Sequence, residues 1–455
     1  MSSLTVFALA VFVVTYFLMF SFPKIRPYVA VGSGILFVII GSLGIFSGFR
    51  YTVSDALSEI DWNVLMMIVG TMGTVFFFIE SRMPNLLSDI IISKTGSVKW
   101  MIVAMSLFAG IISAFVDNVA TVLMMAPVAL AVCKKLKISP VPAVICISIS
   151  SNLQGAATLV GDTTSILLAK AAGLDFMDFF FTEGRPGMFF VTEAGALASA
   201  LIILWMFRRE NQKLEMHDRT EVKDKVPALL LAGTVLSLIL VSFIPYKENA
   251  APGAFYKPDI TNGLLCIAFF LIGVIHQFRK DGNAVKVKAA FREIDFYTIF
   301  LLAGLFVVIG GIAKAGVIDL IGETIARLSG DGSRGSIFLV YTVIVWMSVL
   351  LSAFIDNIPY TATMLPVVAV LAERLSEAGG LSVHPNLLYF GLLAGATLGG
   401  NLTSIGASAN IAGLGILRKE GYEVSSGTFM KYGVPFTLAA AVTGYLLIWL
   451  IWKPV

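Results

Sequence analysis

The stretch SAFVDNVATVLMMAPV, residues 113–128, carries an Asp-Asn pair, beginning at Asp117, in the middle of an otherwise apolar run. Residues 352–367 read SAFIDNIPYTATMLPV and repeat this pattern, with Asp356 in the place of Asp117. Neither stretch contains a Lys or an Arg that would neutralise the carboxylate. One such pair is weak evidence, whereas two copies in the same frame indicate an internal repeat.

The composition of the whole chain is that of a membrane protein. Of its 455 residues, 57% are hydrophobic and only 13% are charged, against roughly 25% charged residues in an ordinary soluble domain. The mean hydropathy is +0.89, and apolar stretches recur from end to end, which leaves no room for a separate soluble domain. Because a chain in lipid has to satisfy its own backbone hydrogen bonds, we predict an all-α polytopic membrane protein. The lipid bilayer is its first partner, and we expect it in the plasma or inner membrane of a prokaryote.

Apolar segments of two lengths divide the chain, and a membrane span needs about 20 helical residues. We predict ordinary spans for residues 4–22, 27–47, 62–82, 186–207, 226–245, 259–277, 296–313 and 431–452. Other apolar regions are too long for one crossing and are interrupted by polar or glycine-rich residues, namely residues 98–135, 141–174, 335–376 and 386–418. We expect broken elements in these longer regions.

Two kinds of broken element are predicted. Residues 98–135 and 335–376 each hold two apolar halves of under 20 residues around the Asp-Asn pair. A half of that length does not cross the hydrocarbon core, so each region is predicted to form a re-entrant hairpin with the pair at its tip. The other two regions are interrupted by GDTTS (161–165) and GGNLTS (399–404), which predict an unwound turn within one crossing. Unwound backbone at that depth has to line a cavity or lie buried in protein.

The two halves of the chain are predicted to be inverted repeats. Each half contains three spans, a hairpin, a broken helix and a final span, which gives about ten transmembrane segments plus two hairpins. Asn401 follows Asp356 at the distance at which Asp162 follows Asp117, so the sequence pairs Asp162 with Asn401. Most of the 32 Lys and Arg residues fall on one side of this arrangement, and the positive-inside rule then places the N-terminus outside. Inverted topology is typical of secondary transporters, whose site lies at the repeat interface.

These repeats define the predicted domain organisation. Residues 1–207 form the first repeat, residues 208–225 a cytoplasmic linker and residues 226–455 the second repeat. EIDW (59–62) and EIDF (293–296) precede corresponding spans in the two halves.

The polar residues of the tips and turns are predicted to form an ion site. Half-helix ends and unwound turns present backbone dipoles and carbonyl groups, and polar side chains complete the site. An Asp in hydrocarbon costs roughly 2.5–3.5 kcal/mol on insertion scales, whereas Asn or Ser caps a helix without that cost. Helix capping alone therefore does not explain the Asp residues, although we expect them to cap the helices as well as to bind an ion. The predicted oxygen-rich lining consists of Asp117, Asn118, Asp162, Thr163, Thr164, Ser165, Asp356, Asn357, Asn401, Thr403 and Ser404.

Other classes of function find little support in the sequence. The mixed charges of residues 208–225 are typical of a solvated linker rather than a nucleic-acid patch. The sequence has no Walker-type phosphate loop, no nucleophile-base constellation and no cofactor fingerprint, so we predict neither an enzyme nor a cofactor, with Na⁺ and H⁺ only as transported or coupling ions. Lys170, inside a broken helix, is expected to snorkel or to pair with an acid.

The paired signatures resemble those of the ion transporter superfamily. Residues 113–128 with GAATLVGDTTS (155–165), and residues 352–367 with GATLGGNLTSIGASAN (395–410), are most similar to the branch of arsenite permeases, bacterial sodium/proton antiporters and the melanosomal P protein. The resemblance implies a homodimer in which a mobile domain carries the tips and broken helices in an elevator-type movement. It also implies tip residues at Asp117, Asn118, Asp356 and Asn357, and unwound turns at Gly161, Asp162, Thr163, Gly400, Asn401 and Leu402. Many relatives read G-D-P-P-N where this chain has GDTTS, which leaves the substrate open.

The charge of the tips favours a cation as cargo. The dicarboxylate branch of the superfamily has tips that look like Ser-Asn-Thr, whereas carboxylates without a basic partner repel a dianion and suit a hard cation such as sodium. We therefore hypothesise a sodium (or lithium)/proton antiporter, with sodium held by Asp117, Asn118, Asp356 and Asn357. The alternatives are an anion or oxyanion permease, moving arsenite or a carboxylate with a coupling ion at the Asp residues, and a passive ion channel.

Overall fold

A computed structural model describes residues 2–212, 220–247, 255–282, 284–326, 333–378 and 383–454 of the chain. Its regular secondary structure is helical apart from a two-stranded turn, in which β1 (Phe181–Thr182) pairs antiparallel with β2 (Arg185–Pro186), and an isolated bridge between Tyr246 and Lys257. The all-α fold class is thereby confirmed. Part of the predicted linker, residues 213–219, lies outside the described residues.

The first half of the chain contains the predicted spans, hairpin and broken helix in order. Its spans are α1 (Ser3–Ser21), α2 (Arg26–Leu43), α4 (Trp62–Glu80) and α10 (Met188–Met206). The hairpin is α6 (Val98–Ser113) and α7 (Asn118–Lys135), and the broken helix is α8 (Val141–Gly155) and α9 (Thr163–Ala172). Two short helices that the sequence analysis did not predict precede α4 and the hairpin, namely α3 (Val53–Glu59) and α5 (Met83–Ser93).

The second half repeats this order. Its spans are α11 (Val226–Ser242), α12 (Thr261–Asp281), α14 (Phe296–Lys314) and α20 (Ser426–Trp452). The hairpin is α16 (Arg334–Ser352) and α17 (Asn357–Ala378), and the broken helix is α18 (Asn386–Gly399), the 3₁₀ turn η5 (Gly400–Leu402) and α19 (Ser408–Lys419). Its two short helices are α13 (Val285–Glu293) and α15 (Val317–Ala326). EIDW and EIDF precede α4 and α14, and their Asp61 and Asp295 cap these helices through the N–H groups of Val64 and Thr298.

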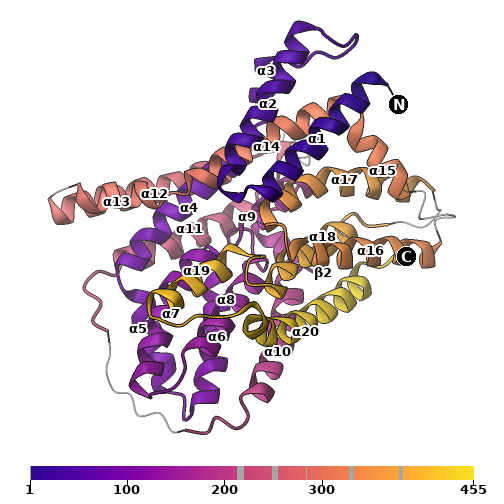
Figure 1. The fold of residues 1–455 in the computed structure, drawn as a ribbon. Coiled ribbons are helices and arrows are strands. Elements are labelled where there is room, and N and C mark those ends of the chain that lie inside the picture. The colour runs from indigo at the N-terminus through magenta and orange to yellow at the C-terminus, as the bar shows by residue number, and fades with distance from the viewer. Residues whose placement is uncertain are drawn as a thin grey trace.

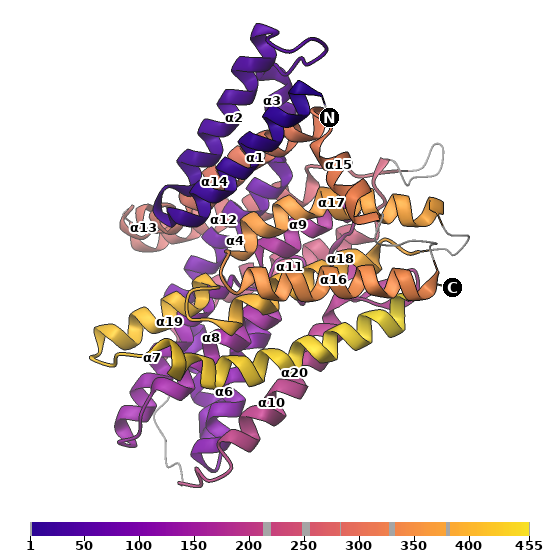
Figure 2. The ribbon, with the colours of Figure 1, turned by 45° about the vertical axis from the view of Figure 1, so that its right-hand side comes forward.

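The helices pack as two groups, each of which takes members from both halves. We call α1, α2, α4, α11, α12 and α14 the single-span group, because α4 packs on α12 and α14 packs on α2. We call α6–α10 and α16–α20 the hairpin group, in which α6 packs on α8, α16 on α18 and α10 on α20. Figures 1 and 2 show the indigo α1 and α2 beside the orange α14, far from them in sequence. The pairs α4–α12 and α14–α2 correspond to each other when the two halves are exchanged, as an internal repeat requires.

Close helix packing in the single-span group depends on glycine. A Cβ at Gly70 in α4 would overlap the backbone of Cys266 in α12, and a Cβ at Gly304 in α14 would lie 2.6 Å from the backbone nitrogen of Val31 in α2. The sequence matches these two glycines across the repeat, and the structure gives both the same role.

Replacing Gly70 by Ala should therefore destabilise the protein by about 1–3 kcal/mol, the usual cost of overpacking, because α4 and α12 have to separate. The measurement is the Tm of protein purified in detergent. Gly32→Ala in α2 is the matched control, since nothing lies within 4 Å of a Cβ there and Ala is the better helix former. Equal Tm values for the two variants would contradict the packing role.

Some predicted lengths differ from those in the structure. The second half of the second hairpin, α17, has 22 residues rather than fewer than 20. It continues past the apolar stretch because ERLSEA, at its end, consists mostly of good helix formers with no breaker. By length and composition, the helices able to cross a membrane among the described residues number ten and include α7, α16 and α17, whereas α11 and the halves of the broken helices are too short. The number ten agrees with the prediction, but its members differ.

Candidate functional site

The two Asp residues lie at the hairpin tips and cap the second helix of each hairpin. The Oδ1 of Asp117 accepts hydrogen bonds from the N–H groups of Val119 and Ala120 at 3.0 and 3.1 Å. The Oδ1 of Asp356 accepts one from the N–H of Ile358 at 3.2 Å. A carboxylate has about four acceptor positions, so capping leaves each Asp able to bind a further ligand.

Asn152, in α8, links both tips to both broken helices. Its Oδ1 accepts hydrogen bonds from the Nδ2 groups of Asn118 and Asn357 at 3.3 and 3.4 Å. Its Nδ2 donates to the Oδ1 of Asn401 at 3.0 Å and to the carbonyl of Thr397 at 2.7 Å. Asn152 is 1% exposed, so these buried hydrogen bonds fix the relative positions of the tips.

The breaks in the two broken helices have the same construction, and this corrects one predicted pairing. A Cβ at Gly161 would lie 2.5 Å from the carbonyl oxygen of Gly155, and one at Gly406 would lie 2.7 Å from that of Gly400. The motif G-x-x-T-x-x-G runs through both breaks, at residues 155–161 and 400–406. In each copy its Thr donates to the carbonyl of the second residue of the hairpin signature SAF, Ala114 or Ala353.

Asp162 is therefore the counterpart of Ala407, not of Asn401 as the equal spacing predicted. Each of the two directly follows the last Gly of its motif and occupies the N-cap position of the following helix. The first break lies at residues 156–162, so Thr163, Thr164 and Ser165 belong to the first turn of α9 rather than to an unwound turn. The second break extends further than predicted, to the beginning of α19 at Ser408.

A cavity of about 470 Å³ lies between the two helix groups at the tips. Its wall contains six carboxylates, those of Glu80, Asp117, Asp162, Glu293, Asp295 and Asp356. Among the described residues that line it there is no Lys, Arg or His. The remaining polar lining consists of Asn118, Asn152, Thr163, Thr298, Asn357 and Ser408. Such a wall attracts cations and repels free anions.

The predicted site residues divide into those that line this cavity and those behind its wall. The wall includes Asp117, Asn118, Asp162, Thr163, Asp356 and Asn357. The cavity lining does not include Gly161, Thr164, Ser165, Gly400, Asn401, Leu402, Thr403 and Ser404.

Several residues behind the wall hold the breaks together. Thr164 donates through Oγ1 to the Oδ2 of Asp162 at 2.8 Å, and so orients a carboxylate of the wall. Asn401, which is fully buried, donates to the carbonyl of Ile149 at 2.8 Å. Ser165 and its counterpart Asn410 donate to the carbonyls of Gly155 and Gly400 at 3.5 and 3.0 Å.

Sequence reasoning missed other residues of the site. Asn152 and Ser408 belong to the hairpin group, while Glu80 and Glu293 are the last residues of α4 and α13 and Asp295 is the N-cap of α14. The signal for Asp295 was present, because EIDF marks the repeat. The signal for Asn152 was the run of polar residues SISSN (148–152) inside an apolar helix.

The tip carboxylates were predicted to have no basic partner, and for Asp356 this is wrong. The Nη1 of Arg26, at the beginning of α2, lies 3.3 Å from the Oδ2 of Asp356. The two residues are more than three hundred positions apart, so no local pattern in the sequence joins them. The fold brings them together because α2 packs on α14, which contacts α17.

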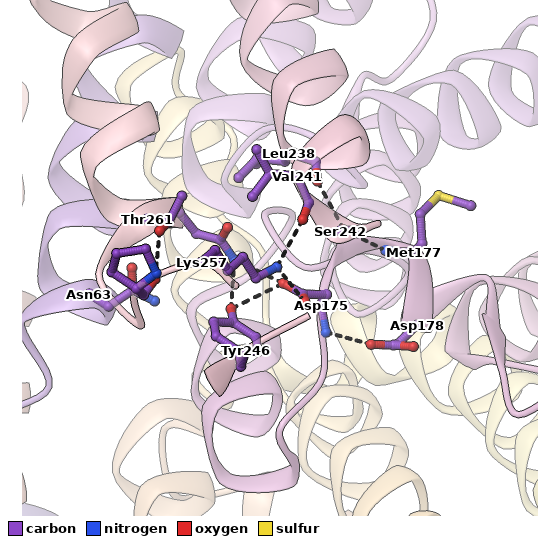
Figure 3. Close-up of polar contacts among 12 residues, drawn as sticks. Asn63, Asp175, Met177, Asp178, Leu238, Val241, Ser242, Tyr246, Lys257 and Thr261 are labelled. Carbon is purple, nitrogen blue, oxygen red and sulfur yellow. Dashed lines mark hydrogen bonds and ion pairs between the residues drawn. The ribbon is translucent and has the colours of Figure 1, made fainter. Parts of the chain in front are cut away.

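Two further ion pairs join the helix groups at the opposite end of α4. Lys170 of α9 lies 3.5 Å from the Oδ2 of Asp61, which confirms the expected acidic partner. The Nζ of Lys257, before α12, lies 2.5 Å from the Oδ2 of Asp175, which follows α9. Figure 3 shows this second pair with the Tyr246 hydroxyl, which donates to the Oδ1 of Asp175 at 3.1 Å.

Replacing Asn152 by Ala should lower both stability and transport. The amides of Asn118, Asn357 and Asn401 would lose a buried partner, and each unsatisfied group costs about 1–3 kcal/mol. The measurements are the Tm in detergent and the uptake rate in proteoliposomes. Ser148→Ala, one turn earlier in α8, is the control, because its hydroxyl donates to the Val144 carbonyl of its own helix. A variant with the Tm and uptake of this control would show that Asn152 is dispensable.

Comparisons with known proteins agree with this architecture. The family model described as citrate transporter, CitMHS, matches residues 15–395. An uncharacterized transporter of Mycobacterium tuberculosis is 30% identical over 458 residues, which cover 98% of this chain and 99% of the relative. The human P protein is 26% identical, over 88% of this chain and 55% of its own length.

Solved structures share the fold. The YdaH transporter of Alcanivorax borkumensis has a TM-score of 0.62 at 14% identity, covering 93% of this chain and 98% of its own. MtrF of Neisseria gonorrhoeae, described among antimetabolite efflux pumps, has a TM-score of 0.55 at 13% identity, with 93% and 94% covered. The family and the mycobacterial relative are described as transporters, not as enzymes. The chain therefore belongs to the citrate transporter family, within the ion transporter superfamily, and is a multi-pass membrane transporter.

Proposed function

We propose that this transporter exchanges sodium or lithium for protons at the carboxylates of the cavity. The observation that carries the proposal is the wall itself, which has six carboxylates and, among its described residues, no basic side chain. Hard cations prefer oxygen ligands, and a carboxyl in a poorly solvated site takes up a proton more readily than one in water. Sodium and protons then compete for the same groups, which couples their movements.

The position of the cavity supports access from the cytoplasm. Its wall reaches Glu80 at the end of α4 and Glu293 at the end of α13, and the positive-inside rule assigns both ends to the cytoplasmic face. The ion pairs of Lys170 and Lys257 lie toward the opposite face and join the two helix groups there. In this arrangement the N-terminus is outside and the cavity is open to the inside.

An elevator-type movement of the hairpin group past the single-span group would carry the site between the two faces. The division into two groups, each with partners from both repeats, is the arrangement that such a movement requires. The homodimer is a further part of the proposal and rests on the family resemblance alone.

The test uses purified protein in liposomes with an imposed pH gradient and a trapped pH-sensitive dye. Addition of sodium or lithium outside should dissipate the gradient promptly, whereas potassium and choline should not. A response to none of these cations would refute cation/proton exchange.

A carboxylate permease is the second candidate, favoured by the family description and by the size of the cavity. At about 470 Å³ the cavity is far larger than one ion needs, since a water molecule takes up about 30 Å³ of liquid volume. A carboxylate could enter this acidic wall only together with cations that neutralise it. Uptake of labelled citrate that depends on an added cation, without dissipation of a pH gradient by sodium alone, would favour this candidate. Resistance to arsenite in a sensitive host would instead favour the oxyanion as cargo.

A further inference from the structure

The two tips have the same construction. In the first, the hydroxyl of Ser113 donates to the Oδ1 of Asn118 at 2.8 Å, and in the second the hydroxyl of Ser352 donates to the Oδ1 of Asn357 at 2.7 Å. Both Asn side chains then donate to Asn152. From this symmetry alone, the protein would have two equivalent cation sites, one at each Asp.

The charges of the two tips differ, however. Asp162 and Asp117 both line a small recess beside the cavity, which Asp356 does not line, so the first tip has two carboxylates. The counterpart of Asp162 in the second half is Ala407, so the second tip has only Asp356. Ser408, the residue after Ala407, contributes a neutral hydroxyl that donates to the Oδ2 of Asp356 at 3.4 Å. The second tip thus has one negative charge where the first has two.

Arg26 cancels the remaining charge of the second tip. Its Nη1 lies 3.3 Å from the Oδ2 of Asp356, and its Nε donates to the carbonyl of Met19 at 3.0 Å, which orients the guanidinium. The side chain of Arg26 is 13% exposed and that of Asp356 is 23% exposed, so water screens the pair much less than it screens a surface pair.

We infer that Arg26 is a resident counter-ion that occupies the second tip and confines cation binding to the first, between Asp117 and Asp162. This inference rests on the proposed function, and it adds that the two halves of the site are chemically unequal. In the conformation described here, Arg26 takes the place at Asp356 that a transported cation takes at Asp117. Arg26 is accordingly a specificity-determining residue, because it sets how many cations the protein binds.

The test is the number of sodium ions bound per chain by purified full-length protein, measured with ²²Na⁺ by equilibrium dialysis. Arg26→Gln should bind one sodium ion more than the wild type, because Asp356 becomes available. The double variant Arg26→Gln/Asp356→Asn should return to the wild-type number, and Arg26→Lys should keep it. Lys24→Gln, which removes a neighbouring exposed positive charge, is the matched control and should also keep the wild-type number.

Two results would overturn the inference, namely an unchanged number of bound ions in Arg26→Gln, or a lower number in Asp356→Asn alone. A different result, no sodium bound by any of these proteins, would refute the proposed function instead. In that case a double-mutant cycle on the Tm values of the Arg26 and Asp356 variants measures whether the two residues interact. Additive effects would then overturn the counter-ion role, and a coupling between the two residues would uphold it.

Discussion

Replacing Asp117 by Asn should reduce cation-dependent transport on the order of 100-fold. Loss of a residue that only orients a metal ligand already costs about 10- to 100-fold in affinity or activity, and Asp117 is proposed to bind the cation itself. Asn caps a helix about as well as Asp, so the hydrogen bonds from Val119 and Ala120 and the shape of the tip remain. Only the negative charge is removed. The measurement is the initial rate of sodium-driven dissipation of a pH gradient in proteoliposomes, with the Tm and elution profile as evidence of folding.

Substitutions at two other acidic residues serve as comparisons for this prediction. Glu373→Gln removes an exposed carboxylate from α17, outside the cavity, and should leave the rate unchanged. Asp356→Asn should reduce the rate less than Asp117→Asn does, because Arg26 already neutralises that carboxylate. Wild-type rates in Asp117→Asn would show that the charge at the first tip is not used in transport. Equal losses in both Asp variants would show that the tips are equivalent, as the sequence repeat by itself suggests.

The hairpins and their tips could be predicted from the sequence because the pattern that specifies them is local. An Asp-Asn pair flanked by two apolar halves requires a turn at that point, and the second copy removes ambiguity. The two tips at Asp117 and Asp356 are accordingly where the sequence predicts them. The short helices α3, α5, α13 and α15 were missed, because a search for apolar stretches long enough to span a membrane passes over segments of this length.

The residues that correspond between the two breaks were predicted wrongly, although the sequence contains a motif that pairs them correctly. Equal spacing from the Asp residues pairs Asp162 with Asn401, but the helix after the tip is longer in the second half, with 22 residues in α17 against 18 in α7. The motif G-x-x-T-x-x-G gives the correct pairing, because in each copy the last Gly lies against the carbonyl of the first Gly, and the first Gly lies against the Asn side chain of its tip. A motif defined by contacts is therefore a better guide to equivalence than a distance counted along the chain.

The ion pairs between the helix groups could not be predicted, because they depend on tertiary packing alone. In the sequence Arg26 falls between two predicted spans, where a basic residue is ordinary, and nothing near it indicates Asp356. Lys257 likewise looks like a loop residue, yet it is 2% exposed in the structure. Long-range polar contacts of this kind leave no periodic signal in the sequence.

Replacing Lys257 by Met should destabilise the protein by about 3–5 kcal/mol, the usual result of removing one partner from a buried ion pair. The side chain of Asp175 is only 10% exposed, and its carboxylate would lose the ammonium group that lies 2.5 Å from it in the wild type. The hydroxyl of Tyr246 and the amide of Asn262 donate to it at 3.1 and 3.3 Å, and neither supplies a charge. The measurement is the Tm of protein purified in detergent.

A second substitution separates the buried charge from the loss of packing. Lys257→Met/Asp175→Leu removes both charges and should recover most of the lost stability, because an apolar pair of similar volume is often as stable as the ion pair it replaces. Lys247→Met, at an exposed lysine of the same connection, is the matched control and should keep the wild-type Tm. If Lys257→Met is as stable as this control, the pair does not hold the two helix groups together. If the double variant is no more stable than the single one, the lost contribution comes from the lysine's own contacts, such as its hydrogen bond to the Val241 carbonyl at 3.1 Å, rather than from an unpaired Asp175.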